Sequence, residues 1–464
     1  MPTPPPTHGP DPAFVRHLVD EHRGTTRPRL ERLWSYYRNA MSGAVPTGRS
    51  RRAYTLAQEA GLPLRITGTP GVHEDDRAGA RREVVIENDI AWRIHLMVDF
   101  LAGRAITIES AAPDATTRTR AERVLNAIWE RSGGVSLLQD MALLGHVYGH
   151  ADLVLRLDER SLLQAGRAGA DQNAREAAIA DAIRIEPIEP TRGIPIVSPA
   201  DYRALDGYLI HVEHEDNTLT ARSSGTGRAT RRRISTLETL TPGRRVVERD
   251  GRVVLDETST LLPDVTPVVH AQNTSQPFRY AGLSEVEPLI PLQDELNTRL
   301  SDRACRVTMQ SFNMYLAKGI EGFDRVPIGP GQVWSTSNPD AQVQAFGGDA
   351  SSPSEDAHIE QIREAMDKAS AVPPLAGGVV RARIGNLSSA SALRITLMAL
   401  LAKTERKRLA YGRAVVEMNT LILRALDACG ILRTDPGDRA TRVVWPDPLE
   451  GIAETSTHTS PPTS

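Results

Sequence analysis

Two groups of side chains in the sequence have types and spacings that could support chemistry. His146 and His150 are four residues apart, the separation that places two zinc ligands on one face of a helix. Three carboxylates, Glu285, Glu287 and Asp294, are close enough in sequence to suggest a metal-dependent nuclease. Neither group is complete, because the histidines lack a third ligand and no further His, Lys or carboxylate joins the acids at a recognisable spacing. We therefore predict no catalytic residue, no metal site and no cofactor, with the two histidines in a helix-to-strand turn.

Composition and missing motifs narrow the class of protein. The sequence contains neither the Gly-x-x-x-x-Gly-Lys-Ser/Thr phosphate loop nor the Gly-x-Ser-x-Gly motif of serine hydrolases. A formal net charge of -3 and a pI near 6.5 argue against tight binding of nucleic acid. Two cysteines, Cys305 and Cys429, do not support a disulfide framework. No apolar run is long enough to span a membrane, so we expect a folded, soluble protein of two to four domains.

The first half of the chain alternates helices and strands. A helix is predicted over 13–37, a strand over 62–67, and a helix over 84–101 that is followed by a strand over 105–109. A second unit of the same kind comprises helices over 118–131 and 135–144 and a strand over 151–157. The Ala- and Gly-rich run 165–180 is expected to be a surface insert.

A β-rich section follows, and we predict an antiparallel sheet there. Short runs of alternating polarity are separated by Gly, Pro or Asn, and Asp250-Gly251 between two such runs indicates a hairpin. The predicted strands are 183–188, 208–214, 244–248, 252–255 and 265–269. An arginine cluster, Arg228 and Arg231 to Arg233, is better explained by solvated or salt-bridged side chains than by a phosphate site.

The stretch from Gly282 to Cys429 has the clearest start and stop signals. Ser284 and Glu287 fit a capping box, and a second helix begins at 352–355 with a cap, a proline and a glutamate. Between these helices, 312–350 loses the helical period and is expected to form a small β module. A Gly- and Arg-containing loop over 375–387 then precedes a long helix over 390–429, about 60 Å at 1.5 Å per residue, in which Gly412 offers a place to bend.

Three motifs give this order of elements a family resemblance. The runs Thr266-Pro-Val-Val-His-Ala-Gln-Asn273, Gly282-Leu-Ser-Glu285 and Leu289-Ile-Pro-Leu-Gln-Asp-Glu-Leu-Asn297 resemble portal proteins of tailed bacteriophages, in particular the group related to phage SPP1. The segment Asn88 to Ile106 is also similar to that family. The resemblance covers about residues 85 to 430.

The resemblance implies an α+β portal fold with named parts. These are a disordered arm (1–12), an α/β wing (13–281), a first stem helix (282–311), a β-rich clip (312–351) and a second stem helix (352–374). A tunnel loop (375–388), a long kinked tunnel helix (389–430) and a short C-terminal region (431–464), with a reduced crown and a disordered tail, complete the chain.

The resemblance also implies functional residues. The DNA-facing tunnel loop would contain Gly377, Gly378, Arg381, Arg383 and Asn386. The stem would line the channel with Asp294, Glu295, Arg299, Asp302, Arg303 and Arg306. The clip would dock partners through Lys318, Phe323, Arg325 and Trp334.

The implied function is a ring of about twelve subunits at one capsid vertex, assembled in the host bacterial cytoplasm and retained in the virion. Its implied partners are double-stranded DNA, bound weakly and without sequence preference, the terminase large subunit, the major capsid or scaffolding protein and a head-tail adaptor, with no membrane. The terminase motor itself is excluded by the missing phosphate loop. A non-DNA oligomeric scaffold or adaptor of a prophage or gene transfer particle stays open as the alternative.

Overall fold

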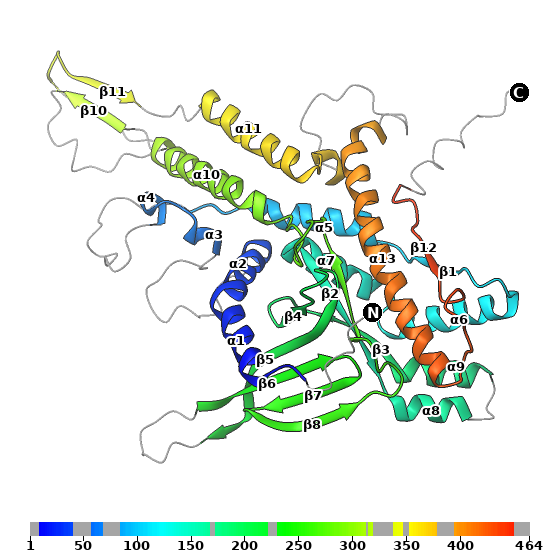
Figure 1. Cartoon of the computed structure of the whole chain (residues 1–464). Helices are drawn as coiled ribbons and strands as arrows, with labels where there is room; N and C mark the ends of the chain where they lie inside the picture. The colour runs from blue at the N-terminus through cyan, green and yellow to red at the C-terminus, as the bar shows by residue number, and fades with distance from the viewer. Residues whose placement is uncertain are drawn as a thin grey trace, which may run out of the picture. The chain divides into compact units, whose positions relative to one another are not determined.

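The computed structural model describes residues 9–39, 57–67, 84–167, 172–220, 230–311, 314–318, 337–346, 352–377 and 394–449 (Figure 1). The chain divides into two compact units. The first comprises Met1–Arg38, Ile90–Leu289 and Asp367–Ser464, and the second comprises Asn39–Asp89 and Ile290–Met366.

The first unit begins with an interrupted helix. α1 (Pro12–Glu21) starts at Asp11, whose carboxylate accepts a 3.0 Å hydrogen bond from the amide of Ala13, and Pro12 occupies the first turn. A π-helical turn, η1 (His22–Thr26), separates α1 from α2 (Arg27–Arg38). The predicted helix over 13–37 is therefore confirmed in extent but is not one regular α-helix.

A five-stranded antiparallel sheet forms one part of this unit. Its strand order is β4-β5-β6-β7-β8, with β4 (Gly193–Val197), β5 (Leu205–Thr220), β6 (Thr230–Thr241), β7 (Arg244–Arg249) and β8 (Arg252–Thr258). The predicted hairpin is confirmed, because Asp250 and Gly251 join β7 to β8 with φ angles of 49° and 75°, as a tight primed turn requires. Val15 of α1 packs against Ile194 and Leu209 of this sheet.

A three-stranded antiparallel sheet, β3-β2-β9, carries the core of the unit. The central strand β2 (His150–Leu157) pairs with β3 (Ile183–Ile188) and β9 (Val268–Gln272), and its first six residues are buried. The helix α7 (Val135–Tyr148) leads directly into β2 through Gly149. The predicted succession of helix and strand is confirmed here.

Three further helices of the first unit, α6 (Ala115–Arg131), α9 (Gln172–Ala182) and the long α13 (Met398–Ala428), contact the three-stranded sheet (Figure 1). The first unit also contains α5 (Asp89–Ala102), whose first residue belongs to the second unit, β1 (Thr107–Ser110), α8 (Glu159–Arg167) and β12 (Thr441–Val444). β12 pairs with β1 in antiparallel register, so the short C-terminal region folds back onto the unit. Within the described ranges, no helix combines the length and apolar character needed to cross a bilayer.

Two sequence predictions in the first half are wrong. The run 62–67 forms a short helix, α4 (Leu64–Thr67), and not a strand. The expected surface insert over 165–180 contains most of α9, where Ile179 and Ala180 are buried and Ile179 is only 1% exposed. The Ala- and Gly-rich composition suggested an exposed insert, but alanine is the strongest helix former and its small side chain allows close packing.

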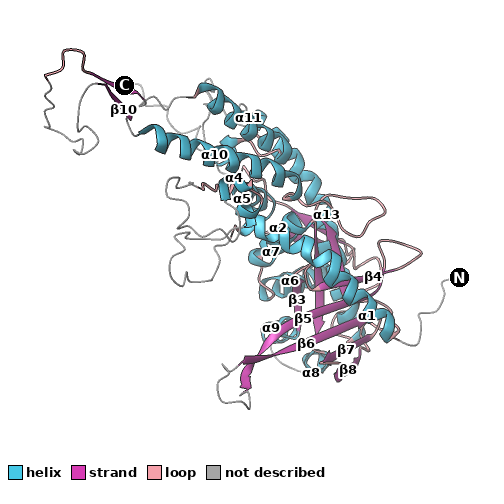
Figure 2. Ribbon diagram, turned by 90° about the vertical axis from the view of Figure 1, so that its left-hand side faces the viewer, coloured by secondary structure: helices cyan, strands magenta, loops and turns pink. Residues whose placement is uncertain are grey.

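The second unit is built around two helices that lie side by side (Figure 2). They are α10 (Ile290–Ser311) and α11 (Pro353–Ser370), the last turn of α11 belonging to the first unit. Between them in sequence, β10 (Met314–Lys318) pairs with β11 (Gln342–Phe346), which confirms two strands of the predicted β module. In the described part of this unit, the short helix α3 (Ala57–Ala60) and α4 are the other α-helices.

An extended segment before α5 packs along α10 within the second unit. The amide of Val85 donates to the Ser301 hydroxyl at 2.9 Å, and the amide of Glu87 donates to the Asn297 side chain at 3.0 Å. The predicted helix start at 84 is therefore too early, because these backbone groups bond to α10 and α5 begins only at Asp89. The same contacts account for the grouping of residues 84–89 with the second unit.

The long helix α13 has 31 residues and runs unbroken through Gly412. The predicted helix over 390–429 is confirmed from Met398 onward, with a turn at Leu397 and helical residues again at 394–396. Residues 378–393 lie outside the described part of the chain.

Candidate functional site

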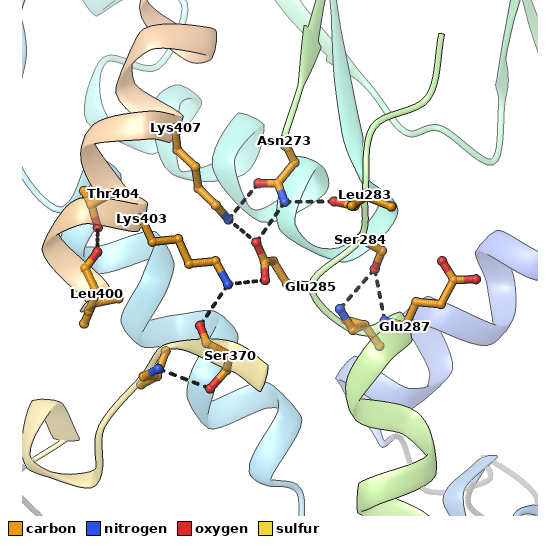
Figure 3. A network of polar contacts seen from close by, with 12 residues as sticks. Asn273, Leu283, Ser284, Glu285, Glu287, Ser370, Leu400, Lys403, Thr404 and Lys407 are labelled. Atoms are coloured by element: carbon orange, nitrogen blue, oxygen red, sulfur yellow. Dashed lines mark hydrogen bonds and ion pairs between the residues drawn. The ribbon is translucent and has the colours of Figure 1, made fainter. Parts of the chain in front are cut away.

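A buried ionic network joins several elements of the first unit, and Figure 3 shows it at close range. Glu285 binds two lysines of α13: its Oε1 lies 2.7 Å from the ammonium of Lys407, and its Oε2 lies 2.5 Å from that of Lys403. The Lys403 ammonium also donates to the backbone carbonyl of Ser370 at 2.8 Å. One carboxylate thus connects the first turns of α13 with the last residue of α11.

Asn273, which follows β9 directly, supplies neutral partners to the same network. Its side-chain oxygen accepts hydrogen bonds from the ammonium of Lys407 at 3.0 Å and from the hydroxyl of Tyr411 at 3.2 Å. Its amide nitrogen donates to the backbone carbonyl of Leu283 at 3.1 Å and to Glu285 at 3.4 Å. Both ends of the amide are occupied, as a fully buried polar group requires.

The segment 282–285 is fixed against the end of α7. The amide of Glu285 donates to the His146 carbonyl at 2.9 Å, and the Ser284 hydroxyl donates to the Val147 carbonyl at 2.6 Å. Gly149 allows this close approach, since a Cβ at that position would lie 2.5 Å from the Gly282 carbonyl oxygen and the φ of 96° disfavours any other residue. Glu285 is therefore held in place by its backbone as well as by its lysines.

Burial and charge act in opposite directions on the titration of this network. Burial alone would raise the pKa of Glu285, but Lys407 and Lys403 outweigh it and lower the pKa to about 2. Burial lowers the pKa of Lys407 to about 8. Lys403, which shares the same carboxylate, also repels the charged form of Lys407 and so acts in the same direction. At neutral pH the carboxylate is ionised, and Lys407 is mostly protonated.

His146 lies in the same region as a neutral side chain. It is fully buried, its Nδ1 lies 2.6 Å from the Ala142 carbonyl, and its ring stacks on that of Tyr411. Burial, followed by the charge of Lys407, lowers the pKa of His146 to about 3. His146 ends up on α7 and His150 on β2, which confirms the predicted helix-to-strand turn.

The three carboxylates considered as a nuclease site have separate partners. Glu285 is bound by lysines, and Glu287 pairs with Arg29 at 2.7 Å. Asp294 belongs to α10, where its carboxylate occupies the space beside Gly61. Within the described residues, no three His, Cys, Asp or Glu side chains converge as a metal site would require.

Of the two hydrogen bonds of the predicted capping box at Ser284 and Glu287, only the one to the serine is confirmed. The Ser284 hydroxyl accepts from the amides of Val286 at 3.0 Å and Glu287 at 3.4 Å, at the start of the 3-10 turn η3 (Glu287–Leu289). The Glu287 side chain pairs with Arg29 and does not form the reciprocal bond of a capping box.

Of the tunnel-loop residues, Gly377 lies within the described chain and Gly378, Arg381, Arg383 and Asn386 lie outside it. Gly377 ends the 3-10 turn η4 (Pro374–Gly377), where a Cβ would come within 2.4 Å of the Trp92 ring. Close packing on α5 thus requires glycine at this position. The DNA-facing role of the loop stays a prediction.

The predicted channel-lining residues of the stem lie on α10, and most form ion pairs. Arg299 bonds Glu295 at 2.7 Å and lies 3.3 Å from Asp302 on the same helix. Arg303 and Arg306 reach across to α11, where they pair with the first-turn carboxylates Asp356 and Glu355 respectively. These charges join the two helices, and whether they also face a channel stays a prediction.

Of the predicted clip residues, Lys318 is exposed at the end of β10. The other three, Phe323, Arg325 and Trp334, lie outside the described residues.

The sequence did not predict the network around Glu285, which was considered there only as one of three carboxylates of a possible nuclease site. The sequence contained a signal for this network, since one helix face is formed by Leu400, Thr404, Lys407 and Tyr411. In the structure all four side chains are buried. A lysine on an apolar stripe requires an anionic partner. The family-like motifs supply that partner and its support, Glu285 and Asn273.

The first unit thus combines helices with antiparallel sheets, and the buried ion pairs of Glu285 connect its elements. The chain belongs to the phage portal protein family of the SPP1 Gp6-like type, whose family model matches residues 16–447. A comparison with curated proteins gave no significant match.

Two chains of solved structures are similar to this one. A chain of the structure described as "Virion of native gene transfer agent (GTA) particle" has 12% identity and a TM-score of 0.42, over 78% of this chain and 81% of that chain. A chain of "Neck of empty GTA particle computed with C6 symmetry" has 13% identity and a TM-score of 0.43, over 79% of this chain and 82% of that chain.

Proposed function

We propose that this protein is the subunit of a portal ring of about twelve copies at one vertex of a viral or virus-like capsid. Double-stranded DNA passes through the central channel during packaging and ejection, and the terminase, the capsid or scaffolding protein and a head-tail adaptor dock on the ring. Membership of the portal family supports this assignment. The mildly acidic charge of -3 also fits, because a channel that passes DNA should not retain it through many lysine and arginine contacts.

The observation that supports the mechanism is that the chain segments before and after 378–393 bond each other beside one buried carboxylate. Ser370 precedes this stretch and bonds Lys403, which follows it, and Lys403 and Lys407 both bind Glu285. When both ends of a loop are fixed in this way, force on the loop is transmitted without displacing the residues that hold its ends. We assign this network the role of anchoring the DNA-facing tunnel loop to the wing.

The loop arginines test the proposal in an assembled particle. The double variant Arg381→Ala, Arg383→Ala should form rings as the wild type does, because neither residue belongs to the anchoring network. The yield of DNA-filled particles, or DNA retention in them, should change severalfold, since the variant loses two cationic contacts per subunit.

The matched control replaces two exposed arginines elsewhere, Arg249→Ala with Arg252→Ala, and should leave packaging unchanged. Normal packaging and retention in the loop variant would remove the loop from the mechanism. Rings that never contain or pass DNA, even with wild-type protein, would favour the non-DNA scaffold instead.

A further inference from the structure

Lys407 and Asn273 bring an amine and a carboxamide together in the core of the first unit (Figure 3). The Lys407 nitrogen lies 3.0 Å from the side-chain oxygen of Asn273. The carbon of that amide is one C=O bond from the same oxygen, so it lies at most about 4.2 Å from the lysine nitrogen. Both side chains are buried. A nucleophile and an electrophile are therefore held close together and away from water.

One oxygen of Glu285 contacts both nitrogen atoms of this pair. Its Oε1 lies 2.7 Å from the Lys407 nitrogen and 3.4 Å from the amide nitrogen of Asn273. The carboxylate is ionised at neutral pH, so it is free to act as a base. A carboxylate in this position can accept a proton from one nitrogen and donate it to the other. The glutamate thus has the geometry of a proton carrier between the amine and the amide.

Tyr411 supplies a hydrogen-bond donor to the carbonyl oxygen of the amide. Its hydroxyl lies 3.2 Å from the Asn273 oxygen, the atom that gains negative charge when an amine adds to the amide. Donors placed at a developing oxyanion stabilise such an addition. The hydroxyl keeps its proton, because burial raises the pKa of Tyr411. The site therefore contains a nucleophile, an electrophile, a proton carrier and an oxyanion donor.

We propose that Lys407 and Asn273 form an isopeptide bond within the chain. The neutral Lys407 nitrogen adds to the amide carbon of Asn273, and an electron pair of the C=O bond moves to the oxygen that Tyr411 contacts. Glu285 accepts a proton from the adding nitrogen and donates it to the leaving nitrogen. The original C–N bond of the amide then breaks, ammonia leaves and the carboxylate is regenerated. The reaction requires no oxidant and no other co-reactant.

The protonation of Lys407 controls how fast this bond forms. Of the charged groups that face the lysine, Glu285 favours its ammonium form, whereas Lys403 and Arg406 disfavour it. His146 also faces it and is neutral, since its pKa is about 3. Burial lowers the pKa of Lys407 to about 8, so the reactive neutral amine is a minority at neutral pH and predominates above pH 8. Protein purified at neutral pH therefore retains the ionic network, and the bond forms slowly there.

The bond connects the three-stranded sheet to the long helix permanently. Asn273 follows β9 directly, and Lys407 lies on α13, 134 positions later in the chain. In the portal ring proposed above, the link makes the attachment of the segment after 378–393 resistant to force. That benefit rests on the proposed function, whereas the chemistry of the bond does not.

Intact mass spectrometry of the full chain tests the bond. Freshly purified protein incubated at about pH 9, above the Lys407 pKa of about 8, should lose one molecule of ammonia, about 17 Da, per chain. After digestion, the peptides that contain Asn273 and Lys407 should be recovered as one linked product. Lys407→Met, which lacks the amine, serves as the control and should keep its mass. Tyr411→Phe, which loses only the hydroxyl, should form the link at least about tenfold more slowly.

Three results would overturn the proposal. They are a wild-type chain that keeps its circular dichroism spectrum and its mass over days, an equal mass loss in Lys407→Met, and a link from Lys407 to a residue other than Asn273. The mass of the chain is measured whether or not it assembles. An absent bond would therefore leave the proposed portal ring intact, and a failure to form rings would contradict the proposed function while the linked peptides still supported the bond.

Discussion

At the scale of single residues, the Glu285 network contains one pKa shift that stabilises the folded state at neutral pH and one that destabilises it. A carboxylate whose pKa falls to about 2 stabilises the folded state above its unfolded pKa of about 4.5, whereas a lysine whose pKa falls to about 8 opposes folding at neutral pH. The two pKa shifts act in opposite directions on stability at neutral pH, so they offset each other in part. The members of the network are therefore sensitive to which partner is removed.

Removal of the carboxylate should cost far more than removal of one lysine. Glu285→Gln leaves two buried ammonium groups without their counter-ion and should lower the free energy of unfolding by about 3–5 kcal/mol. Lys407→Met leaves Glu285 paired with Lys403 and Asn273 bonded to Tyr411, so the loss should be about 1 kcal/mol or less. Urea unfolding of both variants measures the difference. Equal losses would contradict the assignment of Glu285 as the shared counter-ion.

Protonation of His146 should contribute to the unfolding of the protein in acid. Its pKa is about 3 in the folded state against about 6.5 when unfolded, so the unfolded state binds more protons between these values. Above pH 6.5 the ring is neutral in both states and does not oppose folding. As the pH falls from 6.5 toward 3, protonation of the ring in the unfolded state lowers the stability of the folded protein. His146→Phe should therefore move the midpoint of acid unfolding to lower pH, as followed by circular dichroism. An unchanged midpoint would mean that the histidine titrates normally.

At the scale of elements, the pairing of α10 with α11 depends on complementary charge. Arginines trail the first helix and carboxylates lead the second, and Arg303 and Arg306 bind Asp356 and Glu355. The carboxylates lie in the first turn of α11, where they also complement the helix dipole. Charge therefore reinforces the helix alignment that apolar residues such as Ile359 and Ile362 support by burial.

Charge reversal tests this pairing directly. Arg306→Glu places two carboxylates together and should lower the free energy of unfolding by about 1 kcal/mol, a modest value because the pair is only partly buried. The double variant Arg306→Glu, Glu355→Arg should recover at least half of that loss in urea unfolding. A double variant less stable than either single one would show that the pairing does not contribute.

The elements were largely predictable from sequence where local signals agreed. The Asp250-Gly251 hairpin, β2 and β3 and the body of α13 follow turn chemistry and apolar periodicity, which act within a few residues. The start of α5 and the fold of α4 were not predictable in this way, because contacts distant in sequence fix them. Val85, for example, bonds Ser301.

The candidate site was predictable only in part for the same reason. Glu285 and Asn273 stand in family-like motifs, but their lysines lie more than a hundred residues later, and no local spacing connects them. Roles assigned through the family resemblance, such as those of Arg381 and Arg383, stay predictions.

At the scale of the whole molecule, we propose that the chain is one of several identical subunits of a ring. Membership of the portal family is the observation that supports an assembly of several copies. A net charge of -3 on each copy keeps such a ring mildly acidic and favours sliding of DNA over tight binding.

Electron microscopy of the purified full-length protein tests the central claim most directly. If the chain forms a portal ring, we expect closed rings of about twelve subunits around an open channel wide enough for duplex DNA. Mass photometry should give particle masses that match this number of subunits. A monodisperse monomer at high protein concentration would contradict the proposed ring.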